Sequence, residues 1–191
     1  MVKVLHAADF HLDSAFGALP EEKARLRRRE SRGIPARLVE WANDHGAQLM
    51  LLAGDLFDSD NLYGQTAQEL ADALGRFHGR VFIAPGNHDF YAAHGPWGAA
   101  AWPENVHIFT SGRPVCVDEP ELGCAVWGAA FTAAEEADGS ALTAGRRPHH
   151  GRPHPLGRPA TPTAPPTPRP PHPPPQNGEK GLFFTSLAYT H

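Results

Sequence analysis

The sequence predicts an α/β fold in which parallel strands alternate with helices. Three apolar runs rich in strand-forming residues lie at 2–8, 48–53 and 80–84, and a helical pattern separates each run from the next. The second run is almost continuously apolar, which is typical of a strand buried on both faces of a sheet. The resulting β-α-β-α-β order favours a parallel sheet flanked by helices.

The two connecting segments have the spacing of helices. The first spans 19–46, and Gly33 and Pro35 predict a break or kink within it. The second spans 66–78. After the break, three apolar residues have the spacing of one helical face, namely Ile34, Leu38 and Trp41.

Shorter strands are expected after the third apolar run, at 106–109, 114–117 and 124–127. With them, residues 1–138 form one predicted domain. Residues 139–180 are a low-complexity segment rich in Pro, Arg and His, and residues 181–191 form a short apolar ending. The sequence therefore predicts one folded domain, followed by a low-complexity segment and then a short apolar segment.

The low-complexity segment holds little that can form a core. Residues 145–178 contain 13 of the 20 prolines and one large apolar side chain, Leu156. Such a segment buries too little apolar surface to offset its ordering entropy, which predicts disorder. Two origins stay open: an out-of-frame or degenerated stretch of the gene, or a genuine polyproline II linker or SH3-type ligand.

The predicted body is acidic. Residues 1–138 carry 20 Asp and Glu against 11 Lys and Arg, whereas residues 139–178 carry five Arg and no acid. An acidic body suits cation binding and is a poor nonspecific binder of nucleic acid, so DNA binding would draw on metal ions or a partner for positive charge. The chain begins with a strand pattern and holds no membrane-spanning run, so we expect a cytoplasmic protein.

Three polar clusters follow the three predicted parallel strands. Asp9-Phe10-His11 comes after the first, Gly54-Asp55 after the second, and Gly86-Asn87-His88-Asp89 after the third. Ligands of open α/β sheets bind beyond the carboxyl ends of the strands, so these clusters are expected to converge in space. Each cluster alone is weak evidence, because Asp-x-His and Gly-Asp are common in turns.

The side chains in these clusters are metal ligands of mixed type. Asp supplies an anionic oxygen that can bridge two cations, His a neutral nitrogen, and Asn a carbonyl oxygen. This mixture suits Mn, Fe or Zn better than Ca or Mg. In an extended segment Asp9 and His11 would point the same way, and Gly54 and Gly86 permit tight turns and close backbone approach.

On these motifs the sequence resembles the calcineurin-like metallophosphoesterases, a sandwich of β sheets flanked by helices. Residues 7–14, 51–58 and 85–89, with Trp97 and 102–106, are similar more narrowly to the SbcD-type DNA repair exonucleases. The resemblance covers about residues 1–132 well and the final eleven loosely. It implies the following roles: Asp9 and His11 bind one metal, Asp55 bridges both metals, and Asn87 binds the second. His88 lies beside the scissile phosphate, either as the acid that assists the leaving oxygen or as a stabiliser of the transition state.

The resemblance weakens at the end of the sequence, so the C-terminal part is expected to be incomplete. The family has a further metal-binding His after residue 132 and then a Gly-His-x-His motif, but Ala188 and Tyr189 stand at its first two positions. His191 matches, and by resemblance it would complete the first metal site. The second site would then have Asp55 and Asn87, unless a histidine of the low-complexity segment substitutes: His149, His150, His154 or His172.

The function implied is a metal-dependent phosphodiesterase, a DNA exonuclease of the repair type that uses a water activated by two divalent metal ions, Mn foremost. In that family the nuclease works as a homodimer with an SMC-like ATPase partner. Two alternatives stay open. The same motifs serve phosphoesterases that act on nucleotides or phosphoproteins, and the altered last motif fits a degenerate metal-binding remnant without activity.

Overall fold

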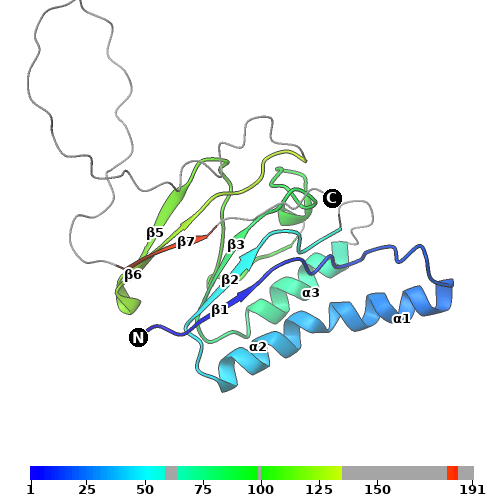
Figure 1. The fold of residues 1–191 in the computed structure, drawn as a ribbon, viewed down its shortest axis with the longest axis horizontal. Helices are drawn as coiled ribbons and strands as arrows, with labels where there is room; N and C mark the ends of the chain where they lie inside the picture. The colour runs from blue at the N-terminus through cyan, green and yellow to red at the C-terminus, as the bar shows by residue number, and fades with distance from the viewer. Residues whose placement is uncertain (59–63, 99, 135–179, 185–191) are drawn as a thin grey trace, which may run out of the picture.

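The computed structural model of the protein describes residues 1–58, 64–98, 100–134 and 180–184. Its first sheet has the strand order β1-β2-β3-β4, and all three pairings are parallel (Figure 1). The strands are β1 (Val4–Ala7), β2 (Leu49–Ala53), β3 (Arg80–Ala84) and β4 (Val106–Ile108). The parallel α/β sheet expected from the sequence is therefore confirmed.

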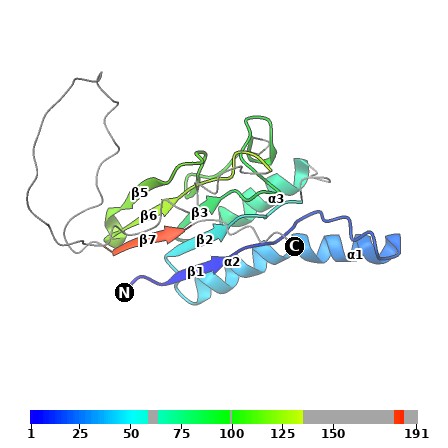
Figure 2. The same ribbon diagram turned by 45° about the horizontal axis from the view of Figure 1, so that its top comes forward.

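The helices lie on one side of this sheet, and the first of them extends past the carboxyl ends of the strands rather than covering their face (Figures 1 and 2). They are α1 (Glu21–Arg32), α2 (Ile34–Asp44) and α3 (Gly64–Leu74). The predicted break at Gly33 is confirmed, since α1 ends there and α2 begins directly after it. The expected helix at 66–78 begins two residues earlier and ends four residues sooner. Among the described residues, no helix combines the length and the apolar content needed to cross a membrane.

The buried face of α2 differs from the predicted one. Ile34 and Trp41 are 40% and 54% exposed, whereas Leu38, the third residue of the predicted face, is partly buried and packs against the core. The residues that α2 buries are Pro35, Val39 and Ala42. Each buried residue is one position beyond a predicted one, which amounts to a rotation of about 100° around the helix axis. The small Ala42 has no exposed surface, whereas the large ring of Trp41 lies outside and stacks on His45, with ring centroids 4.0 Å apart.

A second sheet packs on the opposite face of the first and has the order β5-β6-β7. Its strands are β5 (Val115–Glu119), β6 (Cys124–Gly128) and β7 (Lys180–Phe184). β5 and β6 pair antiparallel around a turn that contains the short 3-10 helix Pro120–Leu122, and β6 and β7 pair parallel. β7 lies at the start of the predicted C-terminal ending. Residues 135–179 and 185–191, which include His191, lie outside the described residues.

The side chains of β2 alternate between two cores. Met50 and Leu52 join the core beneath the helices, while Leu49, Leu51 and Ala53 join the core between the two sheets. All five are buried, which explains why the sequence of this strand is almost continuously apolar. The molecule is thus layered as helices, parallel sheet and second sheet (Figure 2), and the carboxyl ends of β1, β2 and β3 meet at one edge.

Candidate metal centre

The loops that follow β1 and β2 run side by side beyond the end of the sheet. The backbone N–H of Asp9 donates to the Gly54 carbonyl at 3.1 Å, and that of His11 donates to the Asp55 carbonyl at 2.9 Å. Leu12 continues the ladder, with its N–H bound to the Leu56 carbonyl at 2.9 Å. Two segments more than forty residues apart in sequence are therefore held in register by their own backbones.

This register brings three potential metal ligands together. One ligand atom from each of Asp9, His11 and Asp55 lies within 4.8 Å of the other two. Asp55 is buried, with 7% of its surface exposed, while His11 is half-buried and Asp9 is exposed. The cluster is therefore buried in the protein on the side of Asp55 and open to solvent on the side of Asp9.

The three clustered residues have an unusual backbone. Asp9, His11 and Asp55 have φ angles of 56°, 44° and 52°, in the left-handed region that side chains rarely adopt. Asp9 and His11 do converge, but not through the extended segment considered for them: two left-handed residues turn the chain, and the backbone ladder to Gly54 and Asp55 holds the turned segment in place. Strained conformations of this kind persist where surrounding structure enforces them, and they concentrate at functional sites.

The third motif joins the cluster through the backbone and a ring contact. The N–H of His88 donates to Oδ1 of Asp55 at 3.1 Å. The imidazoles of His11 and His88 meet edge to face, with centroids 5.0 Å apart. Asn87, half-buried, directly precedes His88 and so lies at the same strand end. The structure thus brings Asp9, His11, Asp55 and His88 together and places Asn87 beside them.

Gly86 allows this close approach. A Cβ atom at this position would lie 2.2 Å from Oδ1 of Asp55 and 2.6 Å from its backbone nitrogen. These separations are shorter than any van der Waals contact, so no other residue fits without displacing Asp55. The close backbone approach predicted for this glycine is confirmed.

The sequence matches the model of the family described as calcineurin-like phosphoesterase over residues 2–127. That stretch includes the three motifs and the whole parallel sheet. The chain belongs to the calcineurin-like phosphoesterase family. Membership in a family of metallophosphoesterases implies metal-dependent hydrolysis of phosphoesters, for which the cluster of Asp9, His11 and Asp55 provides a candidate metal site.

Two relatives accompany this match. The chain is 37% identical over 116 residues to "Uncharacterized metallophosphoesterase YhaO" of Bacillus subtilis (strain 168), which covers 58% of this chain and 28% of that protein. It is 38% identical over 63 residues to "Putative phospholipase B-like 3" of Caenorhabditis elegans, which covers 32% of this chain and 11% of that protein. The chain therefore spans less than a third of the length of either relative.

The clustered residues of this phosphoesterase fit a divalent transition metal. Two carboxylates and one imidazole form a mixed oxygen and nitrogen donor set, which suits Mn, Fe or Zn. Three protein ligands that leave a position open are typical of catalytic metal sites, whereas structural sites close all four positions. The identity of the metal stays a prediction, and His191, the further ligand implied by resemblance, lies outside the described residues.

Asp89 organises the phosphoesterase site from beneath, a role that the sequence analysis missed. Its carboxylate, 2% exposed, accepts hydrogen bonds from the backbone N–H groups of four residues: Gly86 at 2.6 Å, Asp55 at 3.2 Å, Leu56 at 2.8 Å and Phe57 at 3.3 Å. The indole of Trp97 donates to the Asp89 carbonyl. One side chain therefore ties the loop after β2 to the loop after β3.

Burial governs the protonation of this carboxyl group. Loss of solvent raises the pKa of Asp89 to about 6, even though the N–H groups of Gly86 and Leu56 oppose the shift by stabilising the anion. The nearby Asp55 carboxylate adds to the increase in pKa. A signal was present in the sequence, because Asp89 is the last polar residue of the Gly-Asn-His-Asp motif, but residue type alone does not separate a backbone acceptor from a metal ligand.

Proposed function

We propose that the protein hydrolyses phosphodiester bonds of DNA with the help of two divalent cations, Mn²⁺ foremost. Family membership supports phosphoester hydrolysis, and the narrower similarity of the three motifs to DNA repair exonucleases supports the substrate. The observation that carries the proposal is the convergence of Asp9, His11 and Asp55 within 4.8 Å at an edge that also holds His88.

Each residue has a role in this proposal. Asp9, His11 and Asp55 would hold the first cation, and Asp55 and Asn87 would hold the second. His191, a further ligand by resemblance, lies outside the described residues. When bound, the cations neutralise charge on the phosphodiester and lower the pKa of the water that attacks phosphorus. Because Asp55 belongs to both sites, its position matters most, and the N–H of His88 and the small Gly86 both fix it.

We assign the role of general acid to His88. Its ring is exposed and contacts the His11 ring, so it faces the side of the site that a substrate would enter. The proton that it transfers would pass from an imidazole nitrogen to the leaving sugar oxygen. Imidazole is suited to this step because its ordinary pKa lies close to neutrality.

Asp55→Asn tests the proposed metal binding directly. The substitution keeps the shape of the side chain and removes its charge. If Asp55 serves both sites, the affinity of both sites for the metal should fall. We expect Mn²⁺ titration by calorimetry to show binding weakened at least about tenfold. Asp44→Asn, an exposed aspartate at the end of α2, makes the same chemical change away from the site and should leave binding unaltered.

Activity assays separate the DNA proposal from its alternatives. We expect Mn²⁺-dependent release of nucleotides from DNA and hydrolysis of a small aryl phosphodiester, both reduced by Asp55→Asn. Preference for an aryl phosphomonoester or a phosphopeptide would instead indicate a phosphoesterase that acts on nucleotides or phosphoproteins. Fewer than two metals per chain together with no hydrolysis in Mn²⁺ would identify a metal-binding remnant.

A further inference from the structure

The positive charge of the acidic body is concentrated in one helix. Six of the 11 Lys and Arg residues in the stretch 1–138 belong to the twelve residues of α1: Lys23, Arg25, Arg27, Arg28, Arg29 and Arg32. Nothing in the metal centre uses this concentration of charge. Binding to a partner of opposite charge is one use that would explain it.

Four of these arginines line one groove. Arg25, Arg28, Arg29 and Arg32 are spaced three, four and seven residues apart, which places them on one side of a helix. The groove has a volume of about 500 Å³, and Gly33 and Glu69 of α3 complete its lining. We name these four residues the arginine face. The guanidinium groups of Arg28 and Arg32 are paired with carboxylates, so the excess positive charge of the groove comes from Arg25 and Arg29.

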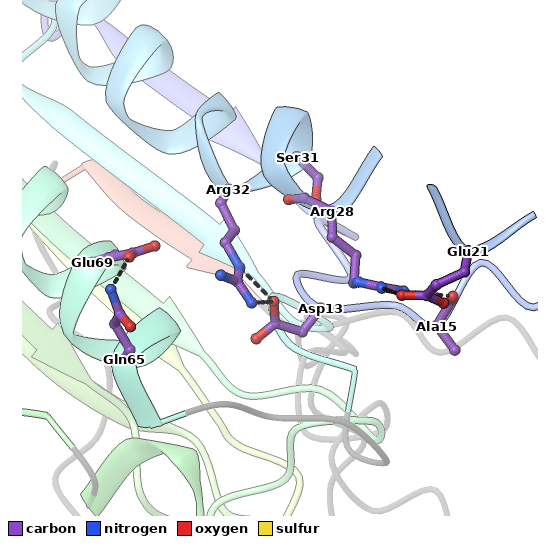
Figure 3. A network of polar contacts seen from close by, with 8 residues as sticks. All are labelled: Asp13, Ala15, Glu21, Arg28, Ser31, Arg32, Gln65 and Glu69. Carbon is purple, nitrogen blue, oxygen red and sulfur yellow. Dashed lines mark hydrogen bonds and ion pairs between the residues drawn. The ribbon is translucent and has the colours of Figure 1, made fainter. Parts of the chain in front are cut away.

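Two residues of the arginine face anchor α1 to the loop that carries Asp9 and His11 (Figure 3). Arg32 donates to Oδ1 of the fully buried Asp13 from Nε at 2.7 Å and from Nη2 at 2.6 Å. Arg28 donates to the Ala15 carbonyl at 2.9 Å and to Glu21 at 2.8 Å. These contacts tie the arginine face to the segment that supplies the first two metal ligands.

The other two residues face solvent. Arg25 and Arg29 are exposed, and in the part of the chain that the structure describes neither takes part in an ion pair. Glu69, across the groove, accepts a hydrogen bond from Gln65 of its own helix at 2.9 Å. The groove thus has an anchored inner half and an outer half whose guanidinium groups are available to a ligand.

We propose that the arginine face binds the sugar-phosphate backbone of a nucleic acid strand and leads it toward the metal centre. The planar guanidinium group binds phosphate through two parallel N–H donors, which makes arginine better suited than lysine to this task. From Arg25 to Arg32 the helix rises about 10 Å, the axial length of about three phosphates in one strand. The leading of the strand to the metals rests on the proposed function, whereas the binding itself does not.

This surface changes the expectation drawn from net charge. The acidic composition predicted that metal ions or a partner would supply the positive charge for DNA. The fold, however, gathers arginines along one groove, and two of them bind the segment that follows Asp9 and His11. Local charge rather than net charge attracts a polyanion over distances comparable to the Debye length, about 8–10 Å at physiological salt.

The test compares two double variants with equal loss of charge. Arg25→Gln/Arg29→Gln removes the outer half of the arginine face, and Arg76→Gln/Arg113→Gln removes two exposed arginines elsewhere. Anisotropy of a fluorescent single-stranded oligonucleotide is measured in EDTA, between about 50 and 200 mM salt. We expect affinity about tenfold weaker in the first variant and a salt-dependence slope smaller by about 1.4, with little change in the second.

Further measurements make each outcome decisive. Arg25→Lys/Arg29→Lys keeps the charge and should recover the salt slope but only part of the affinity, while circular dichroism confirms that α1 is folded. Equal effects of the two glutamine variants, or no binding of the oligonucleotide by the wild type, would overturn the proposal that the arginine face binds nucleic acid.

Competition by polyglutamate as strong as that by DNA would show that the groove binds an acidic protein instead. Absence of Mn²⁺-dependent hydrolysis of a small aryl phosphodiester would sink the proposed function and leave this binding result standing.

Discussion

Two buried joints of the molecule are built from opposite kinds of contact. At the metal centre, the loops after β2 and β3 meet through the carboxylates of Asp55 and Asp89 and the backbone N–H groups that bind them. Between the two sheets, the joint is apolar, with the rings of Phe82 and Phe109 at 6.1 Å and Val126 completely buried. The joint at the metal centre depends on individual hydrogen bonds, whereas the joint between the sheets depends on how well the volumes of the apolar side chains fill it.

This difference predicts how each joint responds to change. A buried N–H group that loses its acceptor retains the full cost of its desolvation, about 1–3 kcal/mol. An apolar joint that loses or gains a methyl group relaxes partly by moving its neighbours. We therefore expect substitutions at the metal centre to alter ligand binding and stability together, and substitutions between the sheets to alter stability alone.

The largest effect on metal binding is expected for Asp89→Asn. The amide keeps the size of the carboxylate but turns one of its two acceptors into a donor that faces backbone N–H groups. Up to two buried N–H groups lose their acceptor, but the neutral amide also removes the cost of burying a charge, which is what raises the pKa of Asp89. We therefore expect a net loss of about 1–2 kcal/mol in the free energy of unfolding at pH 7.5. Urea unfolding followed by fluorescence measures it, and Mn²⁺ affinity should fall about 10–100-fold because the Asp55 loop is released.

Asp72→Asn is the matched control for this variant. Asp72 is exposed on α3 and accepts a hydrogen bond from Gln68 at 2.8 Å, so the same chemical change occurs where water can replace the lost contact. We expect a change within about 0.5 kcal/mol. If the two variants lose equal stability, Asp89 has no special role in joining the loops.

A pair of glycines sharpens the comparison. A Cβ at Gly86 would overlap Asp55, and a Cβ at Gly128 would lie 2.1–2.5 Å from the ring of Phe109. We expect each alanine variant to lose about 1–3 kcal/mol of stability through overpacking. Only Gly86→Ala should also weaken Mn²⁺ binding, by about tenfold or more, because the overlapping atoms belong to a metal ligand. Gly17→Ala, with no atom near its Cβ, should be silent in both calorimetry and urea unfolding.

The same two regions differ in how well the sequence predicted them. The parallel sheet followed from apolar runs, and β3 has the predicted bounds because Arg80 and Pro85 delimit it clearly. The face of α2 was predicted one residue out of place, since Ile34 and Trp41 are as apolar as the residues actually buried. Periodicity finds a helix, but the rotation of that helix is set by packing against the sheet.

The site could be predicted as a set of residues but not as a geometry. Strand-end motifs identified Asp9, His11 and Asp55, because parallel strands bring their carboxyl ends to one edge. Their left-handed backbone depends on hydrogen bonds between loops distant in sequence, which no local pattern encodes. The role of Asp89 depends in the same way on distant contacts, because its carboxylate binds N–H groups of Gly86 and of the loop after β2.

The smallest expected effect lies at the edge of the apolar joint, where His107 of β4 packs on Phe109 at 4.9 Å. Burial and then the charge of Arg80 lower the pKa of His107, while Glu119 opposes them. The unfolded chain therefore takes up a proton below about pH 6.5 that the folded chain resists, so stability is present above that pH and declines as the pH falls. The ring is half-buried, so we expect the free energy of unfolding to fall by a few tenths of a kcal/mol per pH unit, well below the limit of about 1.4 kcal/mol for one fully linked proton.

Urea midpoints measured from pH 7.5 to 5.5 test this expectation. His107→Gln should reduce the dependence of the midpoint on pH, and Glu119→Gln should increase it. A pH dependence that both variants leave unchanged would place this titration elsewhere in the protein.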